Sequence, residues 1–155
     1  MIYSRSAEYA IRALVLLAQV PEGNDTTVKN IAEQEGIPVQ FLAKILQQLA
    51  RKGLLHSSKG RTGGFALRVP PANLRLWDIV EALDGMSQYT ACASGLSECS
   101  DEMPCSMHDS WVALRTRIID YLERNTIADL VKALEQKRKS LAKQRKPRRA
   151  AAARR

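Results

Sequence analysis

The sequence feature that most constrains the fold is a pair of helical patterns separated by one glycine and followed directly by a glycine-rich segment. Apolar spacing predicts a short helix that ends at Glu35 and a second helix over residues 38–52. Gly36 lies between them, where a tight turn needs the positive φ that glycine adopts freely. Residues 54–69 then change to the pattern of two short strands around a glycine-rich tip. The predicted order is therefore helix, turn, helix and hairpin.

This order is that of a winged helix-turn-helix, whose second helix enters the DNA major groove. The start of that helix would face the bases, and the glycines of the hairpin would let the backbone approach phosphates or a minor groove. Gln40 is suited to an adenine edge, and Lys44 to a guanine or a phosphate. We therefore predict DNA contacts from eight residues, which are Val39, Gln40, Phe41, Lys44, Arg51, Lys59, Arg61 and Gly63.

The predicted DNA-binding domain spans residues 1–84 and includes a helix on each side of the motif. Residues 3–19 have helical apolar spacing, and residues 76–84 predict a short amphipathic helix. Thr26 or Thr27 is suited to cap the first helix of the pair. The face expected to point inward on the first helix of the chain consists of Ala10, Ile11, Leu14, Leu17 and Ala18.

Beyond this domain we expect an irregular loop over residues 85–105 and a long helix that begins at about residue 106. Thr126 and an aspartate three residues later are typical of a capping box, so a closing helix completes a segment over residues 106–136. Residues 137–155 are predicted to be a basic, disordered tail. The fold class is thus mainly α, and the long C-terminal helix presents Trp111, Leu114, Ile118 and Leu122 at steps of three and four residues.

The net charge of +8 is unevenly distributed along the chain. Residues 1–75 hold ten Lys/Arg and five Asp/Glu, residues 76–136 hold four and eleven, and residues 137–155 hold ten and none. A cationic surface favours a polyanion and increases its rate of encounter. Aromatic residues are only 5% of the chain, which leaves few side chains to stack on single-stranded bases. The expected partner is double-stranded DNA, with the tail adding non-specific affinity.

Composition also argues against several classes of protein. Hydrophobic residues make up 45% of the chain, which is too many for a wholly disordered protein. No apolar run in the sequence approaches the roughly 18–20 residues of a membrane span, and residues 1–12 lack the layout of a secretory signal. We therefore expect a cytoplasmic protein. No nucleotide loop or catalytic triad stands out, so we do not expect an enzyme.

The cysteines are confined to one loop, at Cys92, Cys99 and Cys105, and His108 follows three residues later. An odd number of cysteines argues against a disulfide framework. Three thiolates and an imidazole suit zinc or an iron–sulfur cluster, and the absence of a tight cysteine pair favours the cluster. Zinc, a thiol switch without metal, and no special role stay open. Glu8, on the first predicted helix, is a further candidate ligand.

From Ile2 to about Lys132 the chain resembles one family through a series of short motifs. These motifs precede the three cysteines, and they are Tyr9-Ala10, Ile31-Ala32-Glu33, Gly36-Ile37, Lys52-Gly53-Leu54-Leu55, Gly63-Gly64-Phe65 and Ile79-Val80-Glu81-Ala82. The resemblance is to the IscR-like, or Rrf2, family of bacterial winged-helix regulators.

The resemblance implies a homodimer in which the long C-terminal helix is the dimerisation helix, and we expect its seam to be formed by Trp111, Leu114, Ile118 and Leu122. It also implies a regulator, most often a repressor, that binds a palindromic operator and senses iron, redox state, nitric oxide or cluster supply. It implies a [2Fe–2S] or [4Fe–4S] cluster on the three cysteines, and we expect [2Fe–2S]. The implied fourth ligand is either His108 or Glu8 of the partner subunit. A zinc- or thiol-based winged-helix regulator without a cluster is the alternative.

Overall fold

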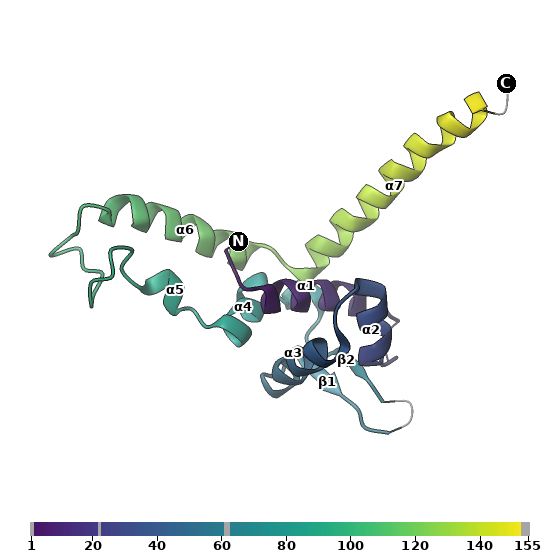
Figure 1. Cartoon of the computed structure of the whole chain (residues 1–155), viewed down its shortest axis with the longest axis horizontal. Helices are drawn as coiled ribbons and strands as arrows, with labels where there is room; N and C mark the ends of the chain where they lie inside the picture. The colour runs from purple at the N-terminus through teal and green to yellow at the C-terminus, as the bar shows by residue number, and fades with distance from the viewer. Residues whose placement is uncertain (1, 22, 61–62, 153–155) are drawn as a thin grey trace.

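The computed structural model of the chain describes residues 2–21, 23–60 and 63–152 (Figure 1). These residues form a mainly helical fold with one small antiparallel sheet, which confirms the predicted fold class. In chain order the elements are α1 (Arg5–Leu17), α2 (Val28–Glu35), α3 (Val39–Arg51), β1 (Leu55–Ser57), β2 (Phe65–Leu67), the 3-10 helix η1 (Pro71–Asn73), α4 (Leu76–Asp84), α5 (Ser87–Thr90), α6 (His108–Arg124) and α7 (Ile127–Ala152).

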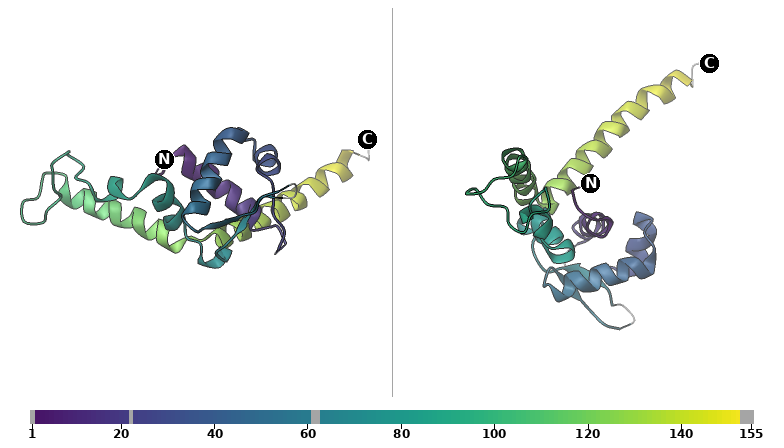
Figure 2. Two further views of the ribbon diagram at one scale, coloured as in Figure 1. Left: turned by 90° about the horizontal axis from the view of Figure 1, so that it is seen from below. Right: turned by 60° about the vertical axis from the view of Figure 1, so that its left-hand side comes forward.

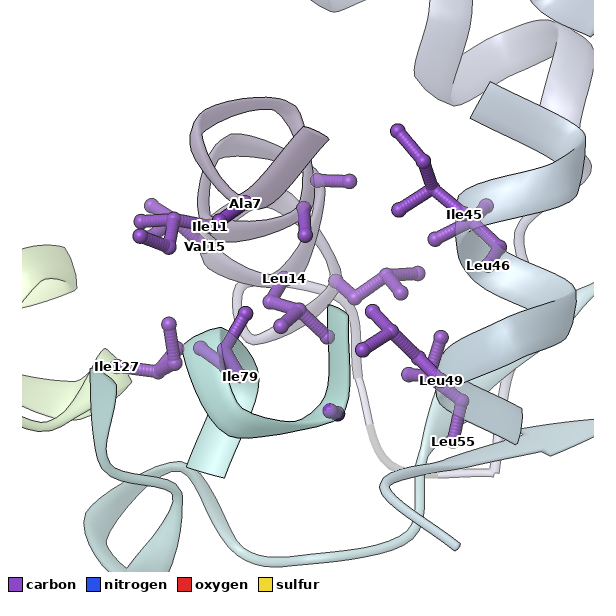
Figure 3. Packing of buried hydrophobic residues seen from close by; sticks show 14 of the residues in the cluster. Ala7, Ile11, Leu14, Val15, Ile45, Leu46, Leu49, Leu55, Ile79 and Ile127 are labelled. Atoms are coloured by element: carbon purple, nitrogen blue, oxygen red, sulfur yellow. The ribbon is translucent and has the colours of Figure 1, made fainter. Parts of the chain in front are cut away.

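Helix α1 lies at the centre of the core, between α3 on one side and α4 and the start of α7 on the other (Figure 3). It begins at Ser4, whose hydroxyl accepts a hydrogen bond from the backbone N–H of Ala7 (3.1 Å). The same serine donates its own N–H (2.8 Å) and hydroxyl (2.5 Å) to the carboxylate of Asp84, which ties the start of α1 to the end of α4. The buried face of α1 includes Ala7, Ala10, Ile11, Ala13, Leu14, Val15 and Leu17.

The helix-turn-helix forms as predicted, because each of its boundaries is encoded locally. Thr27 caps α2 by accepting the N–H of Asn30 (3.2 Å), so of the two candidate threonines the second is the cap. Gly36 ends α2 at a φ of 64°, in the left-handed region that favours glycine. Four apolar residues on one face of α3 are buried against the core, which are Leu42, Ile45, Leu46 and Leu49.

The hairpin is short and is held against the start of α2. Strands β1 and β2 pair antiparallel, with Leu55 opposite Leu67, and an isolated bridge joins Thr26 to Phe65. A Cβ atom at Gly64 would lie 2.6 Å from the carbonyl oxygen of Thr26, so the close approach of these two backbones needs glycine. With its base held in this way, the hairpin projects from the helices as a wing (Figures 1 and 2).

Helices α6 and α7 diverge from one point beside α4 (Figure 1). The capping box at the start of α7 forms, since Thr126 donates its N–H (3.0 Å) and hydroxyl (2.7 Å) to Asp129. Leu122 is fully buried in the core of its own chain, so its prediction as a seam residue is wrong. The reason is that the last turn of α6 packs on α4, which the helical spacing alone does not reveal. Leu114, by contrast, is 52% exposed.

Residues 137–152, which belong to the segment predicted as a disordered tail, form the C-terminal part of α7 and are helical. Its described side chains from Lys132 to Ala142 are all exposed. Lys, Arg, Gln, Leu and Ala are strong helix formers, and they extend a helix that the capping box has already started. Within the described residues, none of the helices combines the length and the apolar character that a membrane crossing needs.

Replacing Leu14 by alanine is expected to lower the free energy of unfolding by about 2–5 kcal/mol, because this fully buried side chain faces the centre of the core in Figure 3. Urea denaturation followed by circular dichroism measures the loss. Leu141→Ala is the matched control, since this leucine is 50% exposed, and it should change the value by less than about 0.5 kcal/mol. Equal losses in the two variants would contradict the packing described.

Candidate functional site

The outer face of α3 presents a set of exposed side chains at its beginning. Val39 is 44% exposed and Phe41 is 41% exposed, which is unusual for apolar residues of this size. Gln40 and Lys44 are exposed beside them. The opposite face of α3 is buried, so these four predicted contacts share the surface that a DNA groove would meet.

Phe41 is held in place by a chain of contacts that the sequence did not indicate. Its ring meets the ring of Tyr9 edge to face at 5.8 Å between centroids. The guanidinium of Arg12 lies over the other ring of this pair, 5.7 Å from the Tyr9 centroid, and pairs with Glu35 (3.1 Å). Part of the role of Phe41 is therefore to fix the beginning of α3 relative to α1 and α2.

The wing supplies cations next to this face. Lys59 is exposed, whereas Arg61, also predicted to contact DNA, lies outside the described residues. Gly63 donates its N–H to the carbonyl of Gly60 (3.0 Å), and a Cβ there would lie 2.5 Å from the carbonyl oxygen of Ser58. Gly63 is thus needed to form the turn of the wing, in addition to any contact with DNA.

A groove between α3 and the sheet extends the basic surface. Arg51, predicted from the sequence, lines this groove together with His56 and Arg68. Arg68 was missed, although it follows β2 directly and is exposed. Helix α3 contains no acidic residue, and Lys44 and Arg51 on it are joined by Lys59 of the wing and Arg68 after β2. We call the exposed start of α3 together with these four cations the reading face.

The four candidate ligands of the cysteine loop come together as two pairs. The Sγ atoms of Cys92 and Cys105 are 4.0 Å apart, and the Sγ of Cys99 is 3.6 Å from Nδ1 of His108. All three thiols are free and half-buried. Within the described residues, no group of three or more metal-ligating side chains converges on one point. The structure therefore brings the three cysteines of the loop and His108 of α6 together as pairs without assembling a single-ion site.

His108 is the first residue of α6, and its side chain is only 5% exposed. Its Nε2 lies 2.7 Å from a carboxylate oxygen of Asp101, a pairing that the sequence did not indicate. This carboxylate fixes the proton on Nε2 and leaves the lone pair of Nδ1 directed at Cys99. A second ring nitrogen held by a carboxylate is the usual arrangement of a metal-ligating histidine.

The loop is anchored at the point where it leaves α5. The indole N–H of Trp111, on α6, donates to the carbonyl oxygen of Ala91 (2.9 Å). The hydroxyl of the buried Tyr89 donates to the carbonyl oxygen of Ile2. These contacts hold Cys92 next to α6, so Trp111 has a role within the chain besides the predicted seam.

Cys92 has the most perturbed thiol of the loop. Hydrogen bonds from the hydroxyl and the backbone N–H of Ser94 lower the pKa of Cys92 to about 7, with smaller contributions from Leu96 and Cys105. A thiol with this pKa is about half ionised at pH 7. The thiolate is the form that binds metals and reacts with electrophiles.

Glu8 lies apart from the two pairs within the chain. It is half-buried in the first turn of α1. The pKa of Tyr3 is raised mainly by burial and next by Tyr121, and the nearby charge of Glu8 is a smaller cause of the same shift. The structure does not bring Glu8 to the cysteines of its own chain.

A winged helix-turn-helix with a basic reading face and a separate cysteine loop defines a DNA-binding regulator. The family model of Rrf2, described as an iron-dependent transcriptional regulator, matches residues 3–133, and the chain belongs to this family. The resemblance expected from the motifs is thereby confirmed. The match ends before the cations of the C-terminal part of α7.

Relatives and solved structures agree with this family. A candidate HTH-type transcriptional regulator of Aquifex aeolicus is 35% identical over 133 residues, which cover 84% of this chain and 92% of that protein. CymR, the global cysteine regulator of B. subtilis, matches with a TM-score of 0.69 at 25% identity over 84% of this chain and 95% of that chain. IscR of T. potens matches with a TM-score of 0.69 at 27% identity over 86% and 88%. Because the TM-scores for CymR and IscR are equal, these structures support the class of regulator but do not favour one of the two proteins over the other.

The pKa of Cys92 predicts the pH dependence of its alkylation in the metal-free protein. The rate with iodoacetamide should rise with a midpoint near pH 7, because the thiolate is the reacting form. Ser94→Ala removes the largest cause of the lowered pKa, so the midpoint should move up toward the ordinary value of about 8.5. Peptide mass spectrometry follows the modification. Ser97→Ala, in the same loop, should leave the midpoint unchanged, and an equal shift in both variants would contradict the assignment.

Proposed function

We propose that this transcriptional regulator is a homodimeric repressor whose affinity for its operator depends on an iron–sulfur cluster bound by the cysteine loop. The observation that carries the proposal is the arrangement of Cys92 with Cys105 and of Cys99 with His108, the histidine being fixed by Asp101. The operator would be read by the exposed start of α3 and the cations of the wing.

The donor set fits a [2Fe–2S] cluster better than a single ion. In such a cluster each of the two irons takes two protein ligands, and histidine replaces cysteine in some proteins. Cys92 and Cys105 would hold one iron, and Cys99 and His108 the other, while Asp101 keeps the proton on the outer nitrogen of the imidazole. When bound, the cluster supplies a reversible one-electron redox couple. The pairing also favours His108 over Glu8 of the partner subunit as the fourth ligand.

A thiol-based regulator is the second candidate, and a specific observation favours it. The two sulfur atoms of Cys92 and Cys105 are 4.0 Å apart, and the lowered pKa of Cys92 makes it the more reactive thiol. The similarity to CymR, described as a cysteine regulator, supports the same alternative. Metal and colour in the purified protein distinguish the two candidates.

The exposed side of α6 supports pairing with a second copy. Leu114 is 52% exposed and Tyr121 is 45% exposed, seven residues apart on the same face. Met107, at the start of the helix, is 46% exposed. A two-fold dimer through this face would set two copies of α3 about one turn of DNA, or roughly 34 Å, apart. Trp111 and Ile118, half-buried within the chain, would border this seam.

Anaerobic reconstitution with iron and sulfide is expected to give a coloured protein with two irons per chain. Cys92→Ala, Cys99→Ala and Cys105→Ala should each abolish the visible absorption, because each removes a ligand. His108→Ala should change the spectrum, and Asp101→Asn should shift it less, because it acts through the histidine. Absorption spectra with iron and sulfide analysis check this.

Glu8→Gln is the control for the fourth ligand and should leave the spectrum unchanged. A silent His108→Ala with an altered Glu8→Gln would assign the ligand to the glutamate. A colourless protein that contains zinc, or no metal, after reconstitution would contradict the cluster.

Substitutions on the reading face should separate base recognition from phosphate binding. Gln40→Ala is expected to weaken operator binding by about 1–3 kcal/mol and to relax preference at one base pair. Lys59→Ala should weaken binding to all sequences and reduce the slope of log K against log salt by about 0.9. Footprinting and fluorescence anisotropy on the promoter region of the protein's own gene measure both. Lys132→Ala, an exposed lysine on α7, should change neither, and a base-specific effect of Lys59→Ala would contradict the assignment.

A further inference from the structure

The C-terminal part of α7 carries a charge that neither the fold nor the family match explains. Residues 137–155 contain ten Lys/Arg and no Asp/Glu, although residues 76–136 before them hold only four Lys/Arg against eleven Asp/Glu. The family match ends at residue 133. None of the ion pairs formed by the described residues involves Lys137, Arg138 or Lys139. The charges of Lys137, Arg138 and Lys139 are therefore not neutralised by an ion pair with any described residue.

The direction of α7 is set by its attachment to the domain. Its first turns pack on α1 and η1, and Arg138 donates a hydrogen bond to the side chain of Gln19 at the end of α1 (3.2 Å). Figure 1 and the right-hand view of Figure 2 show the helix leaving the domain on the side away from α3 and the wing. At about 1.5 Å per residue, residues 137–152 extend roughly 24 Å along this line. Duplex seated on α3 lies on the other side of the protomer.

The composition of the segment selects the kind of polyanion. Residues 137–155 contain no aromatic residue, so they lack the side chains that stack on the bases of single-stranded RNA or DNA. Their one large apolar residue is Leu141, which is too little for the apolar face of a helix that lies in a membrane surface. Closely spaced cations without acids or aromatics fit the regular phosphates of a duplex.

We propose that residues 137–152 of α7 form a second, sequence-independent surface for duplex DNA, which holds a segment other than the one read by α3. This goes beyond operator recognition, because it gives one regulator two DNA-binding surfaces that face in different directions. The protein would then join two duplexes, or two distant parts of one duplex. Binding at the second surface would be steeply dependent on salt and independent of the state of the cysteine loop.

The test compares the full-length protein with a full-length variant in which six cations of α7 are neutral. Its substitutions are Lys137→Gln, Arg138→Gln, Lys139→Gln, Lys143→Gln, Arg145→Gln and Lys146→Gln. Each protein is bound to an immobilised promoter fragment and then offered a labelled 30-base-pair duplex of random sequence. The unchanged protein should capture the labelled duplex, and the neutral variant should capture about tenfold less while protecting the same promoter bases. The slope of log K against log salt for random duplex should fall by about 3 or more, at about 0.9 for each phosphate contact.

Gln40→Ala combined with Lys44→Ala is the matched control, because it changes the reading face and leaves α7 intact. With the random duplex immobilised in place of the promoter, this control should still capture a second duplex. Equal capture by the unchanged protein and the neutral variant would overturn the proposal. A smaller salt slope with unchanged capture would also overturn it, since α7 would then contact the same duplex as α3.

Vesicles of phosphatidylserine and phosphatidylcholine, and a single-stranded RNA of random sequence, are offered in parallel. Retention on either that depends on the six cations, together with duplex capture that does not, would assign the segment to that partner and overturn the duplex assignment.

Discussion

Close packing around α1 positions both the helix-turn-helix and the support of the cysteine loop. Three of its buried residues, Ala7, Ala10 and Ala13, have no exposed surface at all. Because alanine has the smallest apolar side chain, the neighbouring helices approach α1 closely, and a larger residue at these positions would push them apart. The helix-turn-helix and α4 are both positioned against this one helix. The reading face and the cysteine loop thus share a common support.

Helix α4 is the element that connects the two sites. On one side α4 is bonded to α3, since the side chain of Gln48 donates to the carbonyl of Ala82 (2.9 Å). The end of α4 is also bonded to the start of α1, since Ser4 donates to Asp84. On the other side it packs on the last turn of α6, and the chain leaves it directly into the segment that carries the cysteines. A ligand of the loop biases DNA binding only if it interacts differently with two arrangements of such an element. The proposed regulation therefore requires α4 to move with the loop.

The elements that could be predicted from the sequence are those that short segments encode. Gly36, Thr27 and the capping box at Thr126 act through neighbours in the chain, so helix boundaries and the turn followed from spacing. The burial of Leu122 and the contact of Tyr9 with Phe41 depend on residues far apart in sequence, which periodicity does not contain. The pairing of Asp101 with His108 could not be predicted for a related reason, because several acids lie in this loop and the sequence does not show which of them meets the histidine.

The spacing of the cysteine loop explains why its ligands pair as they do. The residues between Cys92 and Cys105 form a long loop whose two ends meet beside α6. There the carbonyl of Cys105 accepts the N–H of His108 (3.0 Å). The middle cysteine is thereby left to face the imidazole at the first turn of the helix. A group bound by both ligand pairs would hold the whole loop against α6. The entropic cost of closing such a loop grows only slowly with its length. The binding free energy of such a group would therefore act on the start of the proposed dimer helix and, through α5, on the end of α4.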